Sequence, residues 1–338
     1  MRTVAFGLCL VALCVLTGAP QVDRKERLWR LLFSPPRFQS LSATVEVQVF
    51  TGPPGQVWTA RLWADQSNHR TDLTFPLPTG ARPVSLISRP DGVWVLLPHI
   101  KRIARHEPGP GPWQPLWGIK TTKEPLAKQN YWVRFSGKDR NDPAIIILDL
   151  VPRHSGNPLR KIHFHAPFRV PLRIERFSPD GKLEMSVSLK DPRFDEPLPA
   201  GIFDVTVPEG WQVEKKEAPA FPVDLKEAEA RLGFVPLVPS WLPPGYAFDA
   251  LFVGKGRHRQ VAHLLYTDGI TVISVFEHPS FGPGHGHRWK RPRPPGMMPI
   301  RMTKRQVAGL DVVIVSDVDQ SWLEKMADSL VPLTVRGR

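Results

Sequence analysis

The side chains best suited to chemistry in this sequence are its eleven histidines, three of which lie close together near the C-terminus. His278, His285 and His287 resemble a short metal-binding tract, because imidazole nitrogen is a common zinc ligand. No carboxylate or cysteine accompanies them at the helical or hairpin spacing of a ligand set. The two cysteines, Cys9 and Cys14, both fall within an apolar segment at the N-terminus. We therefore expect a solvated loop at the histidines, with no metal and no cofactor.

Catalytic motifs are also missing from the sequence. It contains no Gly-x-Ser-x-Gly, no His-Glu-x-x-His, no Gly-x-Gly-x-x-Gly after a strand and no phosphate-binding loop. His163 and His165 alternate with Ile162 and Phe164, which is typical of the exposed face of a strand. We expect no catalytic residue and no enzymatic activity. The enzyme alternative, a hydrolase, would need a cluster of groups with shifted pKa inside a cavity.

A dense basic run follows the histidine tract, and it belongs to a chain whose formal charge is +13. Such runs bind nucleic acid, anionic lipid headgroups or acidic protein segments. The alternative is a solvated loop without a partner. We predict a membrane or partner contact at the residues Arg288, Trp289, Lys290, Arg291 and Arg293, and no nucleic acid.

The N-terminus has the three parts of an export signal. Arg2 precedes an apolar run from Val4 to Leu16, and Thr17-Gly18-Ala19 resembles a cleavage site. We predict a signal peptide over residues 1–19 and an exported protein, with an uncleaved anchor as the alternative. Leu13 before Cys14 disfavours lipidation. The mature chain would then contain no cysteine and no disulfide.

Length and composition favour two domains rich in strands. The chain has 338 residues, of which 38 are proline and 25 are glycine, and this disfavours a helical bundle. A short amphipathic helix is predicted over 23–33, with Asp23 as its cap. Strands with alternating or short apolar patterns then follow, at 41–49, 58–64, 70–75, 84–87, 93–97, 101–105, 131–136, 144–150, 161–165, 172–177 and 183–189.

The strands before residue 215 place their apolar side chains on one long face that few helices could cover. A curved sheet that half-closes around such a face would leave a cavity for an acyl chain. A filled core without a cavity is the alternative. The residues predicted to line the cavity are Val45, Val47, Val49, Trp58, Leu62, Trp94, Met185 and Val187.

A second part of the chain begins after a charged, proline-punctuated linker at 216–222. A helix capped by Asp224 and ended by Gly233 is predicted first. Strands at 248–253, 260–267, 271–277 and 312–316 follow, and a closing helix begins after Asp319. We expect a smaller α/β domain over 223–335.

Several segments resemble a known family. The helix at 23–33, the strand at 40–50, the hairpin from Asp91 to Pro98 and the segments 171–182 and 198–211 resemble the superfamily of the lipoprotein carrier LolA and the N-terminal domain of the RseB/MucB family. Segments of the second part are similar to the RseB/MucB C-terminal domain, namely Phe234–Pro236, Trp241–Tyr246, Tyr266–Gly269 and Val275–Glu277.

The resemblance implies a mostly β (α+β) fold, in which a half-open antiparallel β-barrel with a helical lid spans 20–215 and precedes the smaller domain. It also implies a periplasmic protein that binds the extracytoplasmic part of a membrane anti-sigma factor and is released by a lipid or a lipoprotein acyl chain. A periplasmic carrier of lipid or lipoprotein is the alternative. A carrier needs no second domain, and residues 222–335 therefore favour the regulator.

Overall fold

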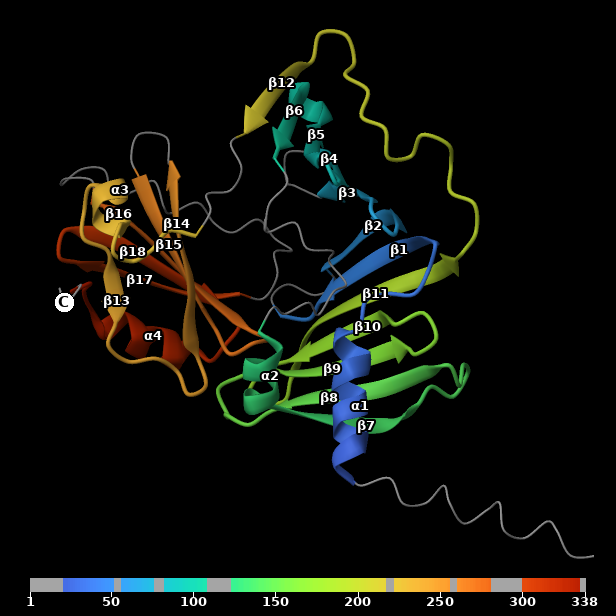
Figure 1. The fold of residues 1–338 in the computed structure, drawn as a ribbon, viewed down its shortest axis with the longest axis horizontal. Helices are drawn as coiled ribbons and strands as arrows, with labels where there is room; N and C mark the ends of the chain where they lie inside the picture. Colours follow the sequence, from blue (N-terminus) through green and yellow to red (C-terminus); the bar gives the residue numbers. More distant parts are fainter. Residues whose placement is uncertain are drawn as a thin grey trace, which may run out of the picture.

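Two β-sheets organise the chain, one on each side of residues 217–221 (Figure 1). The computed structural model describes residues 21–51, 56–75, 82–107, 123–216, 222–255, 260–280 and 300–334. The larger sheet has twelve strands. Their spatial order is β12 (Gln212–Lys216), β6 (Arg102–His106), β5 (Gly92–Leu97), β4 (Arg82–Arg89), β3 (His69–Phe75), β2 (Gln56–Asp65), β1 (Ser40–Val49), β11 (Leu183–Phe194), β10 (Val170–Phe177), β9 (Leu159–His165), β8 (Ile145–Pro152) and β7 (Tyr131–Lys138).

Strand β1 lies near the middle of this sheet because its alternating pattern provides one fully apolar face. It pairs with β2 on one side and β11 on the other, and Val47 is opposite both Trp58 and Val187. The predictions of strands at 41–49, 58–64 and 183–189 are confirmed to within a few residues.

Helix α1 (Gln21–Phe33) lies across β7, β8 and β9 (Figure 1). Trp29 and Leu32 are buried there against strand residues such as Leu148. The prediction that Asp23 caps this helix is wrong, because the helix already begins at Gln21. Helix α2 (Glu124–Asn130) precedes β7, in a segment for which the sequence predicted no regular structure.

The edge strand β12 was not predicted. It pairs in parallel with β6, and residues 195–211 connect it to β11. A 3₁₀ turn (Pro98–Ile100) lies between β5 and β6. The mostly β fold is confirmed. Within the described ranges no strand pair closes the sheet between β12 and β7. The half-open barrel with a helical lid is therefore not confirmed.

The second sheet has five strands, ordered β14 (Ala247–Lys255), β15 (Gln260–Thr267), β16 (Val272–Pro279), β18 (Leu310–Ser316) and β17 (Arg301–Val307), beside a small pair formed by β13 (Leu237–Pro239) and β19 (Leu330–Pro332). Helix α4 (Gln320–Asp328) begins after Asp319, whose carboxylate accepts the Ser321 amide, as predicted. Helix α3 (Ala228–Leu232) ends at Gly233 as predicted but begins after Glu227, not at Asp224. Strand β17 was not predicted from the sequence.

Several predictions lie outside the described residues. They include the signal at 1–19, the basic run at 288–293 and most of the linker at 216–222. The division into domains at this linker stays a prediction. None of the helices in the described ranges is both long enough and apolar enough to span a membrane.

Candidate functional site

Seven of the eight predicted lining residues lie on one face of the large sheet. In the register of β1 with β2, Val45 and Leu62 belong to the same set of alternating positions, whose side chains project from one face of the sheet. The register of β1 with β11 places Val49 opposite Met185. Five of the seven are fully or nearly fully buried, whereas Trp58 and Met185 are partly buried at the margin of the same cluster. The structure therefore brings these residues together as one apolar surface on β1, β2 and β11. That they contact a ligand stays a prediction.

Trp94 lies apart from the other seven residues. It is paired in register with Ile87, which in turn aligns with Arg70 and Trp63, and these positions belong to the opposite face of the sheet. Its indole packs with Ile87 and Ile103, and Val205 and Trp211 pack against this cluster. Arg89 lies over the ring. The expectation that Trp94 shares a face with Trp58 is therefore wrong.

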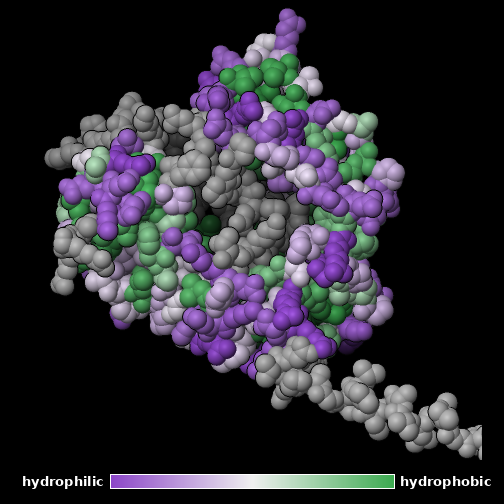
Figure 2. Space-filling model, viewed as in Figure 1, coloured by the Kyte–Doolittle hydropathy of each residue, from purple (hydrophilic) through white to green (hydrophobic). Residues whose placement is uncertain are grey.

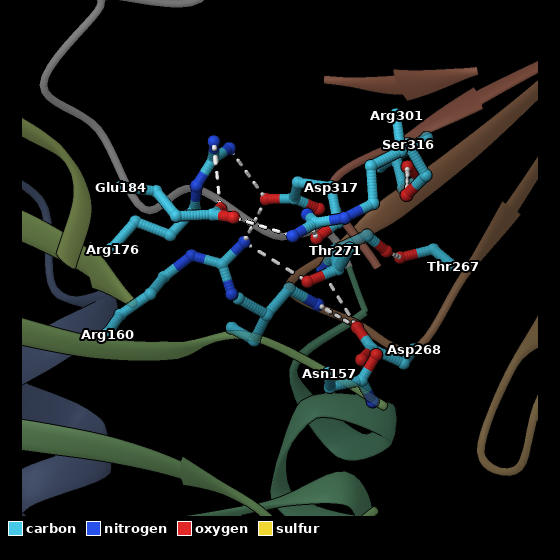
Figure 3. A network of polar contacts seen from close by, with 12 residues as sticks. Asn157, Arg160, Arg176, Glu184, Thr267, Asp268, Thr271, Arg301, Ser316 and Asp317 are labelled. Carbon is cyan, nitrogen blue, oxygen red and sulfur yellow. Dashed lines mark hydrogen bonds and ion pairs between the residues drawn. The ribbon is translucent and has the colours of Figure 1, made fainter. Parts of the chain in front are cut away.

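The structure shows a polar site that the sequence reasoning missed, at the end of the same apolar face. Strand β9 carries Arg160 two residues before the buried Ile162, and strand β10 carries Arg176 two residues after Ile174, so the two arginines are paired in register. Both arginines converge on Asp317, which follows β18 of the second sheet (Figure 3). The Oδ2 atom of Asp317 accepts hydrogen bonds from Arg160 at 3.2 Å and from Arg176 at 3.0 Å.

Glu184 enters the same network because of a β-bulge. The register of β10 with β11 shifts between Arg176 and Phe177, so Glu184 of β11 has no partner residue in β10. Bulges of this kind commonly redirect a side chain. Its carboxylate accepts a 2.6 Å hydrogen bond from Arg301 of β17 and lies 3.6 Å from Arg176 (Figure 3). Arg301 also donates to the backbone carbonyl of Asp317 at 3.0 Å. Charges from both sheets therefore alternate in one buried network.

The turn between β15 and β16 makes a second set of contacts with the large sheet. Together with the network of Arg160, Arg176, Glu184, Arg301 and Asp317, these contacts form what we call the junction between the two sheets. Tyr131 donates a 2.7 Å hydrogen bond to Asp268, and the Asn130 amide donates to the Asp268 carbonyl at 3.0 Å. Ile270, in the same turn, packs into the core beneath α1. The Asp268-Gly269 turn was predicted, but its insertion between the two sheets was not.

Burial sets the protonation of the groups in this junction. It raises the pKa of the Tyr131 hydroxyl well above its usual value, and the negative charge of Asp268 acts in the same direction. Burial also raises the pKa of Asp268, against the lowering effect of the hydrogen bonds that its carboxylate accepts. Tyr131 is therefore a neutral donor, and the junction has the properties of a structural contact.

Glycines allow the two sheets to approach closely. A Cβ atom on Gly156 would lie 2.3 Å from the indole of Trp322, and one on Gly245 would lie 2.1 Å from Oδ1 of Asn130. A Cβ atom on Gly269 would lie 2.3 Å from the backbone nitrogen of Ala127. A larger residue at Gly156 or Gly245 would require the Trp322 or Asn130 side chain to move, whereas one at Gly269 would meet the backbone of Ala127.

The histidines form no metal centre in the described part of the chain, where no group of three or more His, Cys, Asp or Glu side chains could hold an ion. Ile162 and Phe164 are buried, and His163 and His165 alternate with them as predicted. His165 stacks against Phe168. His285 and His287 lie outside the described residues.

No model of a known protein family matches the chain, and no curated protein sequence matches it. Solved structures do match. A crystal structure of MucB aligns with 92% of this chain and 98% of its own, at 17% identity and a TM-score of 0.55. The Pseudomonas aeruginosa MucA/MucB complex aligns with 93% and 99%, at 16% identity and a TM-score of 0.58. A structure of MucB in complex with MucA(peri) aligns equally far, at 17% identity and a TM-score of 0.57. The resemblance to MucB is therefore confirmed at the level of the fold, across both sheets.

Proposed function

We propose that the protein is a periplasmic regulator that binds the extracytoplasmic segment of a membrane anti-sigma factor and senses lipid through the apolar face of its large sheet. The observation that carries this proposal is the likeness to MucB over more than nine tenths of the chain, which includes the second sheet. MucB itself has been crystallised in complex with MucA(peri). We propose no enzymatic activity.

The junction supports a coupling between the apolar face and the second sheet. Ile162 and Arg160 project from the same face of β9, and Ile174 and Arg176 from the same face of β10. A lipid that moves these strands would therefore also move the arginines that hold Asp317. Allostery requires such a connection between two sites, and the junction provides it in a few residues.

The binding step is tested with residues 20–338 and the periplasmic segments of the membrane anti-sigma factors of the same organism. Isothermal titration calorimetry should show a stoichiometric complex, and added lipid should weaken it. If no segment of any anti-sigma factor from the same organism binds the folded protein, the proposal is wrong.

A lipid or lipoprotein carrier is the second candidate, since the apolar face alone would be sufficient for it. A carrier should move lipid between two vesicle populations at a rate that depends on protein concentration. A regulator should bind lipid without this transfer, and mass spectrometry of organic extracts from the purified protein would identify a retained lipid in either case.

A further inference from the structure

A pocket of about 290 Å³ lies between α1 and β7, on the outside of the large sheet's last strand. Its base is aromatic and apolar, because Trp29, Tyr131 and Val133 are all buried. The α1–β7 pocket is lined by Lys25, Trp29, Lys128, Tyr131, Trp132, Val133, Arg134 and Arg153. Half of these residues are cationic, and none is acidic.

One of these four cations, Lys128, forms ion pairs with carboxylates in the described part of the chain. The ammonium of Lys128 lies 3.0 Å from Glu26 and 2.8 Å from Glu124. Lys25, Arg134 and Arg153 are exposed, and no carboxylate in the described part of the chain forms an ion pair with any of them. Three of the four cations therefore form no ion pair in the described ranges, although Asp149 lies opposite Arg134 in the register of β7 with β8.

Trp132 lies in the middle of these charges. The residue is 38% exposed, so part of its apolar ring is accessible to solvent. The guanidinium carbon of Arg153 lies 4.7 Å from the ring centroid, and that of Arg134 lies 5.9 Å away. An exposed indole beside arginines is the arrangement that suits the boundary between lipid headgroups and acyl chains.

The pocket does not have the design of a site for a single small anion. Such sites usually converge backbone amides or buried donors on one point, whereas Lys25, Arg134 and Arg153 are exposed and Lys128 already has two carboxylate partners. Figure 2 shows hydrophilic residues gathered over α1 and the adjoining end of the large sheet. Unpaired cations spread around one exposed indole fit an extended negative surface.

We propose that the α1–β7 pocket docks on an anionic lipid bilayer, with Trp132 at the level of the headgroups. This contact differs from the basic run predicted at 288–293 and does not depend on the proposed function. It would keep the large sheet at the membrane whether or not a protein partner is bound.

Co-sedimentation of the mature chain with vesicles tests the proposal. Vesicles of phosphatidylcholine with about a third phosphatidylglycerol should bind the protein, and vesicles of phosphatidylcholine alone should not. Arg134→Gln combined with Arg153→Gln should weaken binding about twenty-five-fold, since each basic residue near an anionic surface contributes about a factor of five. The matched control combines Arg193→Gln with Arg231→Gln, which removes the same charge from exposed positions elsewhere.

Each outcome decides the proposal. Equal binding by the two double variants would overturn it, as would binding that is lost only when the basic run at 288–293 is neutralised. Binding of a polyglutamate peptide that depends on Arg134 and Arg153, without binding to vesicles, would overturn it in favour of an acidic protein partner. Circular dichroism should show both double variants folded, because all four arginines are exposed.

Trp132 provides an independent measurement. Brominated lipids quench indoles that reach the headgroup region, so the quenching of wild type should exceed that of Trp132→Phe. Trp94→Phe is the control, because Trp94 is buried in a cluster with Ile87 and Ile103. Equal quenching of wild type and Trp132→Phe would show that this indole does not contact the bilayer and would overturn the docking geometry.

Discussion

Tyr131 donates a 2.7 Å hydrogen bond to the carboxylate of Asp268, and this bond joins the first strand after α2 to a turn of the second sheet. Both side chains are almost fully buried. A hydrogen bond to a charged group contributes about 1.5–3 kcal/mol, and removing one partner leaves the other without it in a dry site. The orientation of the two sheets therefore depends on a contact whose energy can be measured.

A double-mutant cycle measures this contact. Tyr131→Phe and Asp268→Asn should each lower the free energy of unfolding by about 1–3 kcal/mol, and the double variant should lose less than the sum. Urea titration followed by tryptophan fluorescence provides the three values. Strict additivity would mean that the hydrogen bond does not couple the two residues in solution.

Asp317 should be the most sensitive charge in the junction. Asp317→Asn removes the carboxylate that neutralises Arg160 and Arg176, and breaking a buried pair in this way costs about 3–5 kcal/mol. The control is Asp328→Asn, since Asp328 is exposed and its ion pair with the partly exposed Arg305 should contribute at most about 1 kcal/mol. Similar losses of stability in the two variants would argue against a buried network.

The close approach at Gly269 can be separated from its backbone strain. Gly269→Ala adds a methyl group that would lie 2.3 Å from the Ala127 nitrogen, at a φ of +98°. Gly309→Ala adds the same group at a φ of +77°, where no atom lies within 4 Å. The Gly309 variant should lose only about 1–2 kcal/mol, whereas the Gly269 variant should lose more and should show a larger radius of gyration by small-angle X-ray scattering. An unchanged radius of gyration in Gly269→Ala would contradict the assigned junction.

Alternation along single strands allowed much of the fold to be predicted. Ser40–Val49 follows a period of two in sequence, and Leu41, Val45, Val47 and Val49 are buried on one face, with Ala43 partly buried between them. Strand β17 was missed because Arg301–Val307 carries mostly polar residues and gains its place by pairing with the apolar β18. Edge strand β12 is also mostly polar, and it was missed because its partner β6 is more than a hundred residues away in the chain.

The site was less predictable because it depends on relations between strands. Whether Trp94 and Val47 lie on the same face of the sheet depends on the register of four successive strand pairings. A shift of one residue in any of these pairings would move Trp94 to the other face. The junction did leave one signal. Arg160 and Arg176 occupy positions where the apolar phase of their strands continues, and a charge in such a position is expected to have a buried partner.

Glu277 should make stability depend on pH. Its side chain is fully buried and accepts the Leu237 amide at 2.8 Å, and burial raises its pKa from 4.5 to about 8. The folded state therefore holds a proton that the unfolded state releases above about pH 4.5, so stability should fall as the pH rises from about 4.5 to about 8.

Glu277→Gln removes this titratable group, so the folded and unfolded states of the variant no longer differ in proton binding at position 277. Wild type should lose on the order of 3 kcal/mol more than Glu277→Gln between pH 5 and pH 8, as measured by urea titration at each pH. The exposed Glu209→Gln is the control and should follow wild type. Parallel curves for wild type and Glu277→Gln would show that Glu277 ionises normally in the folded protein.

The two tryptophans on opposite faces of the large sheet test where lipid binds. Trp58→Phe shortens a side chain on the proposed lipid-sensing face, whereas Trp94→Phe makes the same change on the other face. The affinity for a fluorescent fatty acid, measured by displacement, should fall severalfold in Trp58→Phe, because the smaller ring provides less apolar contact area. Trp94→Phe should bind like wild type although its stability falls by a similar amount. If both variants bind like wild type, or if only Trp94→Phe weakens binding, the acyl chain does not bind on the face formed by β1, β2 and β11.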